Sequence, residues 1–225
     1  MEKQKTWRVL SESVLFHGLR ADEIEALLLN VKYKILRYKR NEIYTLEGMD
    51  CCYVDMVLSG CVTAYMVGDS GKSLLMGKIG VGEVIAPAFV YAKSHKMPVT
   101  VKADADTEVL RMSPEELLHF IDCNAIVRHN FIVSISEVVV HLTQKIHMLN
   151  LMTARQKVVS YLKELCRQQG GSIVDLGCSR QELADSFGIQ KYSLARILSQ
   201  LSEQGIVTVE GRRITIRNMQ ALRRL

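Results

Sequence analysis

The most regular apolar pattern in the chain predicts one long helix between Asn130 and Met152. Apolar residues recur there in steps of 3, 4, 3, 4 and 3, which is a heptad repeat on one helix face. The a positions are Ile132, Val139 and Ile146, and the d positions are Ile135, Leu142 and Leu149. Branched residues at a with mostly leucine at d favour a parallel two-stranded pairing. We therefore predict that these six residues form a dimer interface; the alternative is a helix that lies on its own domain's core.

The sequence ahead of this helix changes from a helical to a strand pattern. Residues 1–30 predict helices, with Ile24, Leu27 and Leu28 on one face after a turn at Phe16–Gly18. From Val31 to Met112, short alternating runs are separated by glycines, and such spacing indicates an antiparallel barrel or sandwich. The clearest runs are Val31-Tyr33-Ile35, Tyr53-Asp55-Val57, Val62-Ala64-Met66 and Val99-Val101-Ala103, and Gly68-Asp69-Ser70-Gly71 predicts a hairpin tip.

Three capping signals mark where helices begin. They start at Ser113, which is followed by Pro114 and Glu116, at Thr153 with Gln156, and at Ser179 with Glu182. The second signal predicts a break between two helices at the end of the long one. We expect an N-terminal effector-sensing β-roll domain over 1–124, a dimerisation helix over 125–152 and a winged helix-turn-helix domain over 153–225, hence an α+β fold.

The last third of the chain predicts a winged helix-turn-helix. An amphipathic helix around Val158–Cys166 ends at Gly170-Gly171, and a short strand follows at Ser172–Val174. In the run from Arg180 to Leu201, the small Ala184 allows a close helix crossing and Gly188 permits a tight turn, while Leu194 and Ile197 face inward. Two further strands, joined by Glu210-Gly211 as the expected two-residue turn, form a hairpin that we interpret as a wing.

The second helix of this motif is expected to enter the major groove of DNA. It exposes Gln190, Lys191, Tyr192, Ser193 and Arg196. Arg196 suits guanine, Gln190 suits adenine, and Tyr192 suits a phosphate or a thymine methyl group. Phosphate contacts are expected from the start of the first helix and from the wing. These candidates are Ser179, Arg180, Gln181, Arg212 and Arg213, and for each the alternative is a solvated surface position.

The distribution of charge agrees with a polyanion partner. The net charge is +5, and residues 155–225 hold 12 basic against 6 acidic residues, whereas the rest of the chain holds 17 against 18. All the excess positive charge therefore lies in the C-terminal part, which favours nucleic-acid binding there. A basic segment that serves only solubility is the alternative.

Other classes of protein fit the sequence less well. No apolar run reaches ~18 residues and the first ten residues are polar, so we expect neither a membrane span nor a signal peptide. The six cysteines form no disulfide framework and predict reduced thiols in a cytoplasmic protein. A metal enzyme on the β-roll needs clustered histidines, but His95 is the only one between Val31 and Met112, so we expect no enzyme.

In its order of β-roll, long helix and winged helix, the chain resembles the Crp/Fnr family of bacterial transcription regulators over nearly its whole length. The matching motifs are Asn41-Glu42, Glu47-Gly48, Leu58-Ser59-Gly60, Gly82–Ile85, Ser179–Ala184 and Lys191–Leu198. The resemblance implies a homodimer that binds a palindromic operator in double-stranded DNA and contacts RNA polymerase. The family's recognition helix typically reads R-E-T-x-x-R, and Lys191, Tyr192, Ser193 and Arg196 occupy those places here, so the acidic reader is absent.

The same comparison argues against the two best-known effectors. Family members that bind cyclic nucleotides carry Gly-Glu and Arg-Ser or Arg-Thr pairs, and this chain has Ala86-Pro87 and Met97-Pro98 instead. Without the arginine a buried phosphate lacks its countercharge, so we expect no cyclic AMP binding. Members with an iron–sulfur cluster have closely spaced N-terminal cysteines, whereas Cys51 is the first here, so we expect no such cluster.

What remains is an apolar effector pocket between roll and long helix, with Ile85, Phe89, Met97 and Val99 as lining candidates. The segment from Ala86 to Val99 is similar, more weakly, to haem-dependent nitrosative-stress regulators of the HcpR type. A haem needs an axial histidine, methionine or cysteine, for which Met66, His147 and Met148 are candidates. A solvated His147 and a core-packed Met66 are the alternatives, and a constitutive DNA-binding protein without effector remains a further one.

Overall fold

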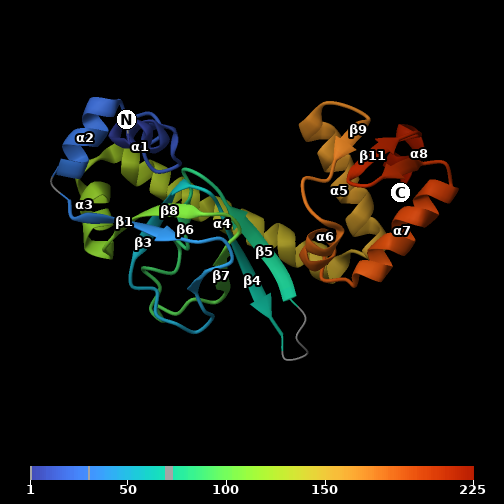
Figure 1. Ribbon diagram of the computed structural model, residues 1–225, viewed down its shortest axis with the longest axis horizontal. Helices are drawn as coiled ribbons and strands as arrows, with labels where there is room; N and C mark the ends of the chain where they lie inside the picture. The colour runs from blue at the N-terminus through green and yellow to red at the C-terminus, as the bar shows by residue number, and fades with distance from the viewer. Residues whose placement is uncertain (1, 30, 69–72) are drawn as a thin grey trace. The chain divides into compact units, whose positions relative to one another are not determined.

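The protein combines helices and antiparallel sheets in two compact units (Figure 1), and the α+β prediction is confirmed. The computed structural model describes residues 2–29, 31–68 and 73–225, with backbone alone for residues 2–6. One unit comprises Met1–Ser70 and Met76–His141, and the other Gly71–Leu75 and Leu142–Leu225. The predicted hairpin tip at Gly68–Gly71 falls largely outside the described residues.

The N-terminal unit is a β-roll of two four-stranded sheets preceded by two helices, α1 (Glu2–Glu12) and α2 (Ala21–Leu29). The sheets have the strand orders β1-β8-β3-β6 and β2-β7-β4-β5. The strands are β1 (Tyr33–Tyr38), β2 (Ile43–Thr45), β3 (Val54–Ser59), β4 (Val62–Val67), β5 (Ser73–Ile79), β6 (Val84–Ile85), β7 (Thr100–Ala103) and β8 (Thr107–Met112). The predicted roll is thus present.

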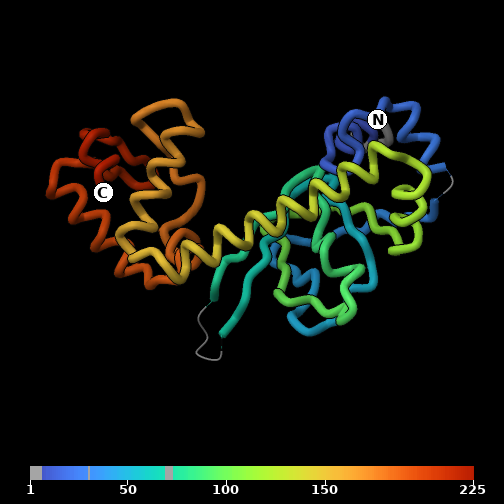
Figure 2. Tube along the Cα trace, turned by 180° about the vertical axis from the view of Figure 1, so that it is seen from behind, coloured from blue at the N-terminus to red at the C-terminus, as the bar shows by residue number. Residues whose placement is uncertain are grey.

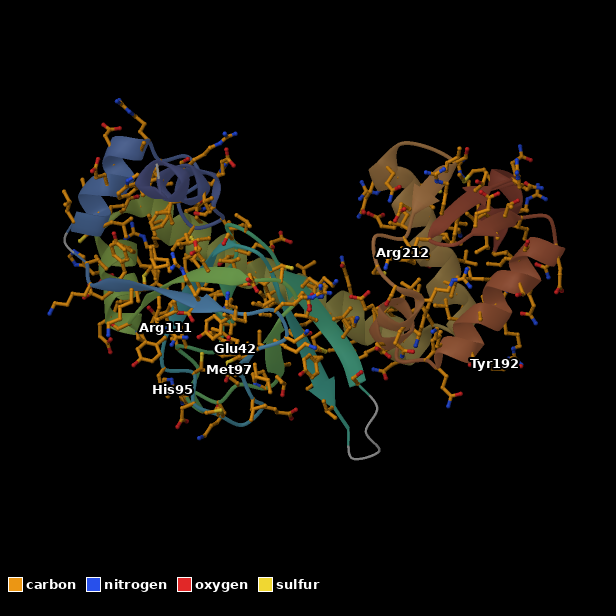
Figure 3. All side chains as sticks on the ribbon, in the orientation of Figure 1. Glu42, His95, Met97, Arg111, Tyr192 and Arg212 are labelled. Atoms are coloured by element: carbon orange, nitrogen blue, oxygen red, sulfur yellow. The ribbon has the colours of Figure 1, made fainter. Side chains whose placement is uncertain are left out.

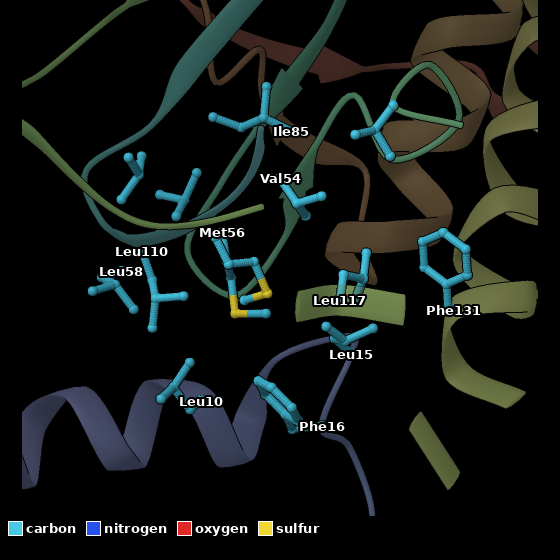
Figure 4. Close-up of a cluster of buried hydrophobic side chains, with 14 of the residues drawn as sticks. Leu10, Leu15, Phe16, Val54, Met56, Leu58, Ile85, Leu110, Leu117 and Phe131 are labelled. Atoms are coloured by element: carbon cyan, nitrogen blue, oxygen red, sulfur yellow. The ribbon is translucent and has the colours of Figure 1, made fainter. Parts of the chain in front are cut away.

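The core of this unit lies between the sheets and the helices (Figure 4). Met56 and Leu110 from neighbouring strands meet Leu10 and Phe16 from the N-terminal segment. Phe16 packs edge-on against Phe120, with ring centroids 5.7 Å apart, a geometry that aromatic pairs prefer. Burying such side chains contributes roughly 1.5–3 kcal/mol each. The helical N-terminal segment therefore belongs to the roll's core, as the buried Ile24 and Leu28 of α2 also show.

Helices begin where the capping residues predict. Ser113 accepts a hydrogen bond from the Glu116 amide and starts α3 (Pro114–Cys123), which has proline at its first turn. The long helix α4 (Ala125–Leu151) follows, and it ends just before Thr153, whose side chain and that of Gln156 form a reciprocal capping box. The predicted break at Thr153 is therefore confirmed.

The two rows of the heptad on α4 differ in their exposure to solvent. The a residues Ile132, Val139 and Ile146 are 57%, 58% and 60% exposed, whereas the d residues are half-buried. Ile135, one of the d residues, packs against the core of the N-terminal unit. Val133 and Val140 widen the exposed apolar strip. The d row therefore lies on its own chain, as the second alternative expects, whereas the predicted dimer interface stays a prediction that the open a row leaves possible.

Figure 2 shows α4 as one unbroken yellow helix. By length and composition alone α4 is long and apolar enough to cross a membrane, and the core helices of soluble proteins share these two properties. It carries the charged residues Arg128, Glu137 and Lys145.

The C-terminal unit surrounds its own apolar core. It contains α5 (Ala154–Gln169), β9 (Ile173–Asp175), α6 (Arg180–Ser186), α7 (Lys191–Glu203), β10 (Val207–Glu210), β11 (Arg213–Ile216) and α8 (Met219–Arg224). Its three strands are antiparallel in the order β10-β11-β9. Ala184 and Leu194 are fully buried and Ile197 nearly so, as predicted for a helix-turn-helix.

The turn of the wing differs by one residue from the prediction. Glu210 pairs with Arg213, so the two loop residues are Gly211 and Arg212 and not Glu210-Gly211. Gly211 takes the positive φ of 61° that a II′ turn needs at its first loop residue. The backbone freedom of glycine at that place sets the register.

Candidate nucleic-acid interface and effector site

Helix α7 presents one polar face to solvent, because its opposite face is buried. Leu194 and Ile197 lie in the core of the unit, whereas Gln190, Lys191 and Arg196 are exposed. Tyr192 is 75% exposed on the first turn (Figure 3), and Ser193 is half-buried. Gly188, with a φ of 65°, makes the turn ahead of the helix. The residues predicted to read bases are thus brought together on the first two turns.

The predicted phosphate contacts at the start of α6 are already engaged within the chain. The Ser179 hydroxyl accepts from the Glu182 amide at 3.2 Å, and the Glu182 carboxylate accepts from the Ser179 amide at 2.7 Å. Arg180 donates from Nη2 to the carbonyl oxygen of Gly211 at 3.1 Å, and Gln181 donates to Asp185 at 2.8 Å. Arg180 therefore joins the helix-turn-helix to the wing, using one of five guanidinium donors.

The wing carries three exposed arginines. Arg212 lies in the turn (Figure 3), Arg213 begins β11, and Arg217 follows its end. Sequence reasoning missed Arg217, which donates from Nε to Thr208 Oγ1 at 3.0 Å. The sequence did offer a signal for Arg217. It lies two residues after Thr215 and four after Arg213, and every second residue of an extended strand points to the same face.

Two lysines that sequence reasoning also missed support the turn between α6 and α7. Lys145 donates to the carbonyl oxygen of Ser186 at 2.7 Å, and Lys157 donates to that of Phe187 at 3.0 Å. Burial, together with the nearby charge of Lys157, lowers the pKa of Lys145 to about 8. Burial likewise lowers the pKa of Lys157. Lys157 directly precedes the apolar Val158 and Val159, and this was the only local indication in the sequence that its side chain is buried.

The predicted effector residues lie in the packed core of the N-terminal unit. Ile85 and Met97 are each 2% exposed, Val99 is also buried, and Phe89 is partly buried against the same core. Ala86 adopts a φ of 54°, which glycine takes freely and other residues rarely do. It stands where the family resemblance places a glycine.

A cavity of about 520 Å³ lies elsewhere in the same unit, against α3. Its lining residues are Asp50, Cys51, Cys52, Val90, Tyr91, His95, Pro114, Glu115 and Leu118. Tyr91 donates to the carbonyl oxygen of Pro114 at 2.7 Å and packs edge-on against Phe131 of α4, with ring centroids 5.9 Å apart. Burial, with smaller contributions from Glu115 and Asp122, raises the pKa of Tyr91 to about 12. The cavity wall therefore contacts the long helix.

A second cavity of about 560 Å³ is lined by α1, α2, β1 and β8, and includes Trp7 and Tyr33. The haem-ligand candidates line neither cavity. Met66 is 37% exposed on β4, so its expected place in the core is wrong. His147 is exposed, and Met148 packs against the core of the C-terminal unit. The two described cavities therefore give no support to a haem held by these three residues.

Two family models match the chain in the order that the fold shows. Residues 35–124 match the cyclic nucleotide-binding domain, and residues 156–225 match the Crp-like helix-turn-helix domain. The chain is 24% identical over 210 residues to the cyclic AMP receptor protein of Thermus thermophilus, covering 93% of this chain and 95% of the relative.

Solved structures share the fold at lower identity. A CooA mutant from Carboxydothermus hydrogenoformans has a TM-score of 0.74 at 18% identity, covering 89% of each chain. The c-di-GMP-responsive regulator CLP of Xanthomonas campestris has a TM-score of 0.72 at 22% identity, covering 89% of this chain and 100% of that one. With both domains matched in sequence and fold, the chain belongs to the Crp/Fnr family, whose named relatives are transcription regulators.

Proposed function

We propose that this protein is a homodimeric, cytoplasmic transcription regulator that binds a palindromic operator and is switched by an effector in the β-roll. The observation that carries the proposal is the exposed face of the first two turns of α7. Gln190, Lys191, Tyr192 and Arg196 are open to solvent there, whereas Leu194 and Ile197 on the opposite face are buried. Such a face supplies the donors and acceptors needed to read base edges. RNA polymerase is the partner that the family implies.

The exposed row of α4 supports a second copy of the chain as its partner. Ile132, Val139 and Ile146 repeat every seven residues and leave apolar surface open to water, which a parallel copy would cover. A two-fold axis along α4 would also present two recognition helices symmetrically, as a palindromic site requires.

The proposed effector is neither cyclic AMP nor an iron–sulfur cluster. Met97 occupies the place of the family's phosphate-binding arginine and is 2% exposed among apolar neighbours, where a phosphate would lose its water without gaining a countercharge. The cavity at Tyr91 offers an alternative binding place, and Tyr91 itself packs against Phe131 of α4. Ligand binding there would bias the packing of α4, and linkage makes DNA binding respond.

The test is a selection of bound sequences from random double-stranded DNA with the purified full-length protein. We expect a palindrome whose half-site centres lie ~34–36 Å apart, one helical turn. Arg196→Ala should weaken binding to the selected operator in a gel-shift titration. Arg8→Ala, which removes an exposed arginine from α1, is the matched control and should bind like wild type. Recovery of no sequence preference would refute the proposed function.

A further inference from the structure

The turn between α6 and α7 is fixed by ammonium groups that come from outside the helix-turn-helix. Lys145 reaches it from α4, with Nζ 2.7 Å from the Ser186 carbonyl oxygen. Lys157 reaches it from α5, with Nζ 3.0 Å from the Phe187 carbonyl oxygen and 3.4 Å from that of Leu149. The last carbonyl groups of a helix lack amide partners within it and attract cations. The two lysines therefore act as a C-terminal cap for α6.

This cap is not explained by the stability of the fold. Lys157 is only 7% exposed and Lys145 is half-buried, and the ion pairs seen in the described part of the chain include neither lysine. One buried and one half-buried cation lose hydration and repel each other, so apolar side chains of similar size would be accommodated at lower cost. What the two lysines provide, and apolar side chains would not, is directed hydrogen bonds that fix the position of the turn between α6 and α7.

Apolar contacts reinforce the same attachment. A Cβ atom added at Gly188 would lie 3.3 Å from Leu149 Cδ2 and 3.7 Å from Leu74 Cδ1, so both side chains pack against the turn. Leu149 and Lys145 are four residues apart and therefore share a face of α4. Directly beside Lys145 is Ile146, a residue of the exposed a row. One short segment of α4 thus carries both the contact to the turn and part of the surface for a second chain.

We propose that Lys145 is a positioning residue that ties the end of α4 to the turn ahead of α7 and so sets the angle at which the recognition helix is presented. The inference rests on the proposed function, because the angle matters only if α7 reads DNA. In a dimer, a fixed angle makes affinity depend on the spacing between half-sites. With the tie released, the two reading helices adapt to several spacings.

The experiment measures binding of full-length protein to the selected operator and to versions with one or two base pairs inserted or removed between the half-sites. The affinity of wild type should fall about tenfold or more when the spacing is altered. The affinity of Lys145→Met should fall less than about threefold. Lys163→Met is the matched control, because Lys163 also donates to a backbone carbonyl, that of Arg223 at 3.2 Å, but away from the turn. It should discriminate spacings like wild type.

Two further measurements separate orientation from folding. Lys145→Arg keeps the cation and should restore most of the discrimination. Spin labels at Ser199 on the exposed side of α7 should give a narrow distance distribution between the subunits of wild type and a broad one in Lys145→Met. Wild-type discrimination and a narrow distribution in Lys145→Met would overturn the inference. If wild type itself selects no operator, the proposed function has failed instead.

Discussion

Arg111 on β8 and Asp55 on β3 face each other as register partners and form a bidentate ion pair inside the β-roll. The guanidinium donates from Nε to Asp55 Oδ1 at 2.8 Å and from Nη2 to Oδ2 at 2.6 Å. Asp55 is fully buried, and the Arg111 guanidinium also donates to Tyr38 at 3.1 Å and lies 4.8 Å from the ring centroid of Tyr53. Burial acts to lower the pKa of Arg111, but its bonds to Asp55 outweigh that effect and raise it.

We expect Arg111→Met to destabilise the protein by about 3–5 kcal/mol, because it leaves the Asp55 carboxylate buried without a countercharge. Chemical denaturation of the purified variant measures the loss. Lys39→Met, which removes the cation of a solvent-exposed pair with Asp106, should leave the unfolding midpoint almost unchanged. Equal losses in the two variants would contradict a special role for the buried pair.

Replacing Ile146 by Asp should convert the dimer to monomers and abolish operator binding together. The reason is that a carboxylate placed in the apolar row would be buried against its own symmetry copy. Analytical ultracentrifugation reports the mass, and a gel shift reports binding. Gln144→Asp adds the same charge two residues away, off the seam, and should remain dimeric. Tight operator binding by a monomeric Ile146→Asp protein would contradict the role of α4.

Substitution of Arg196 and of Arg212 by alanine should lower DNA affinity in different ways, one dependent on DNA sequence and the other on salt. Arg196→Ala should cost about 1–3 kcal/mol on the selected operator and relax the preference at one base position, since it removes a base contact. Arg212→Ala should weaken binding to all sequences and reduce the slope of log affinity against log salt by about 1, since it removes a phosphate contact. Fluorescence anisotropy over a salt series measures both, and a reversed pattern would exchange their roles.

Stability should rise with pH in the range where Lys145 titrates. The pKa of Lys145 is about 8 in the folded protein, whereas its ordinary value, taken for the unfolded chain, is 10.5. Between these two values the unfolded chain therefore binds more protons than the folded protein. The free energy of unfolding of wild type should therefore increase relative to that of Lys145→Met as pH rises from 8 to 10.5. Denaturant titrations of both proteins across this range supply the comparison. A decrease would mean that the charged form is favoured by folding.

Features encoded by neighbouring residues were predictable from the sequence. The capping boxes at Thr153 and Ser179 each involve residues three apart, and the structure has both. The burial of Leu194 and Ile197 and the presence of a long helix were predictable by periodicity, but the heptad pattern starts at Asn130 whereas α4 begins at Ala125. Such features depend on local geometry alone.

Features that depend on distant contacts were not predictable. The bond from Lys157 to Phe187 spans 30 residues and that from Lys145 to Ser186 spans 41. The heptad indicated a seam, but contacts with residues far along the chain, such as those of Ile135 with the N-terminal core and of Leu149 with the turn at Gly188, decide that the d row is half-covered. Apolar residues such as Ile85 and Met97 were predicted to line a cavity, yet the same pattern also describes packed core.

The left-handed backbone of Ala86 has a consequence for redesign. An alanine at a φ of 54° is held there by its surroundings at a cost of order 1–3 kcal/mol, so the loop keeps a shape that a glycine would adopt without strain. A redesign of the roll can therefore place glycine at position 86, which would keep the shape of the main chain and remove the strain.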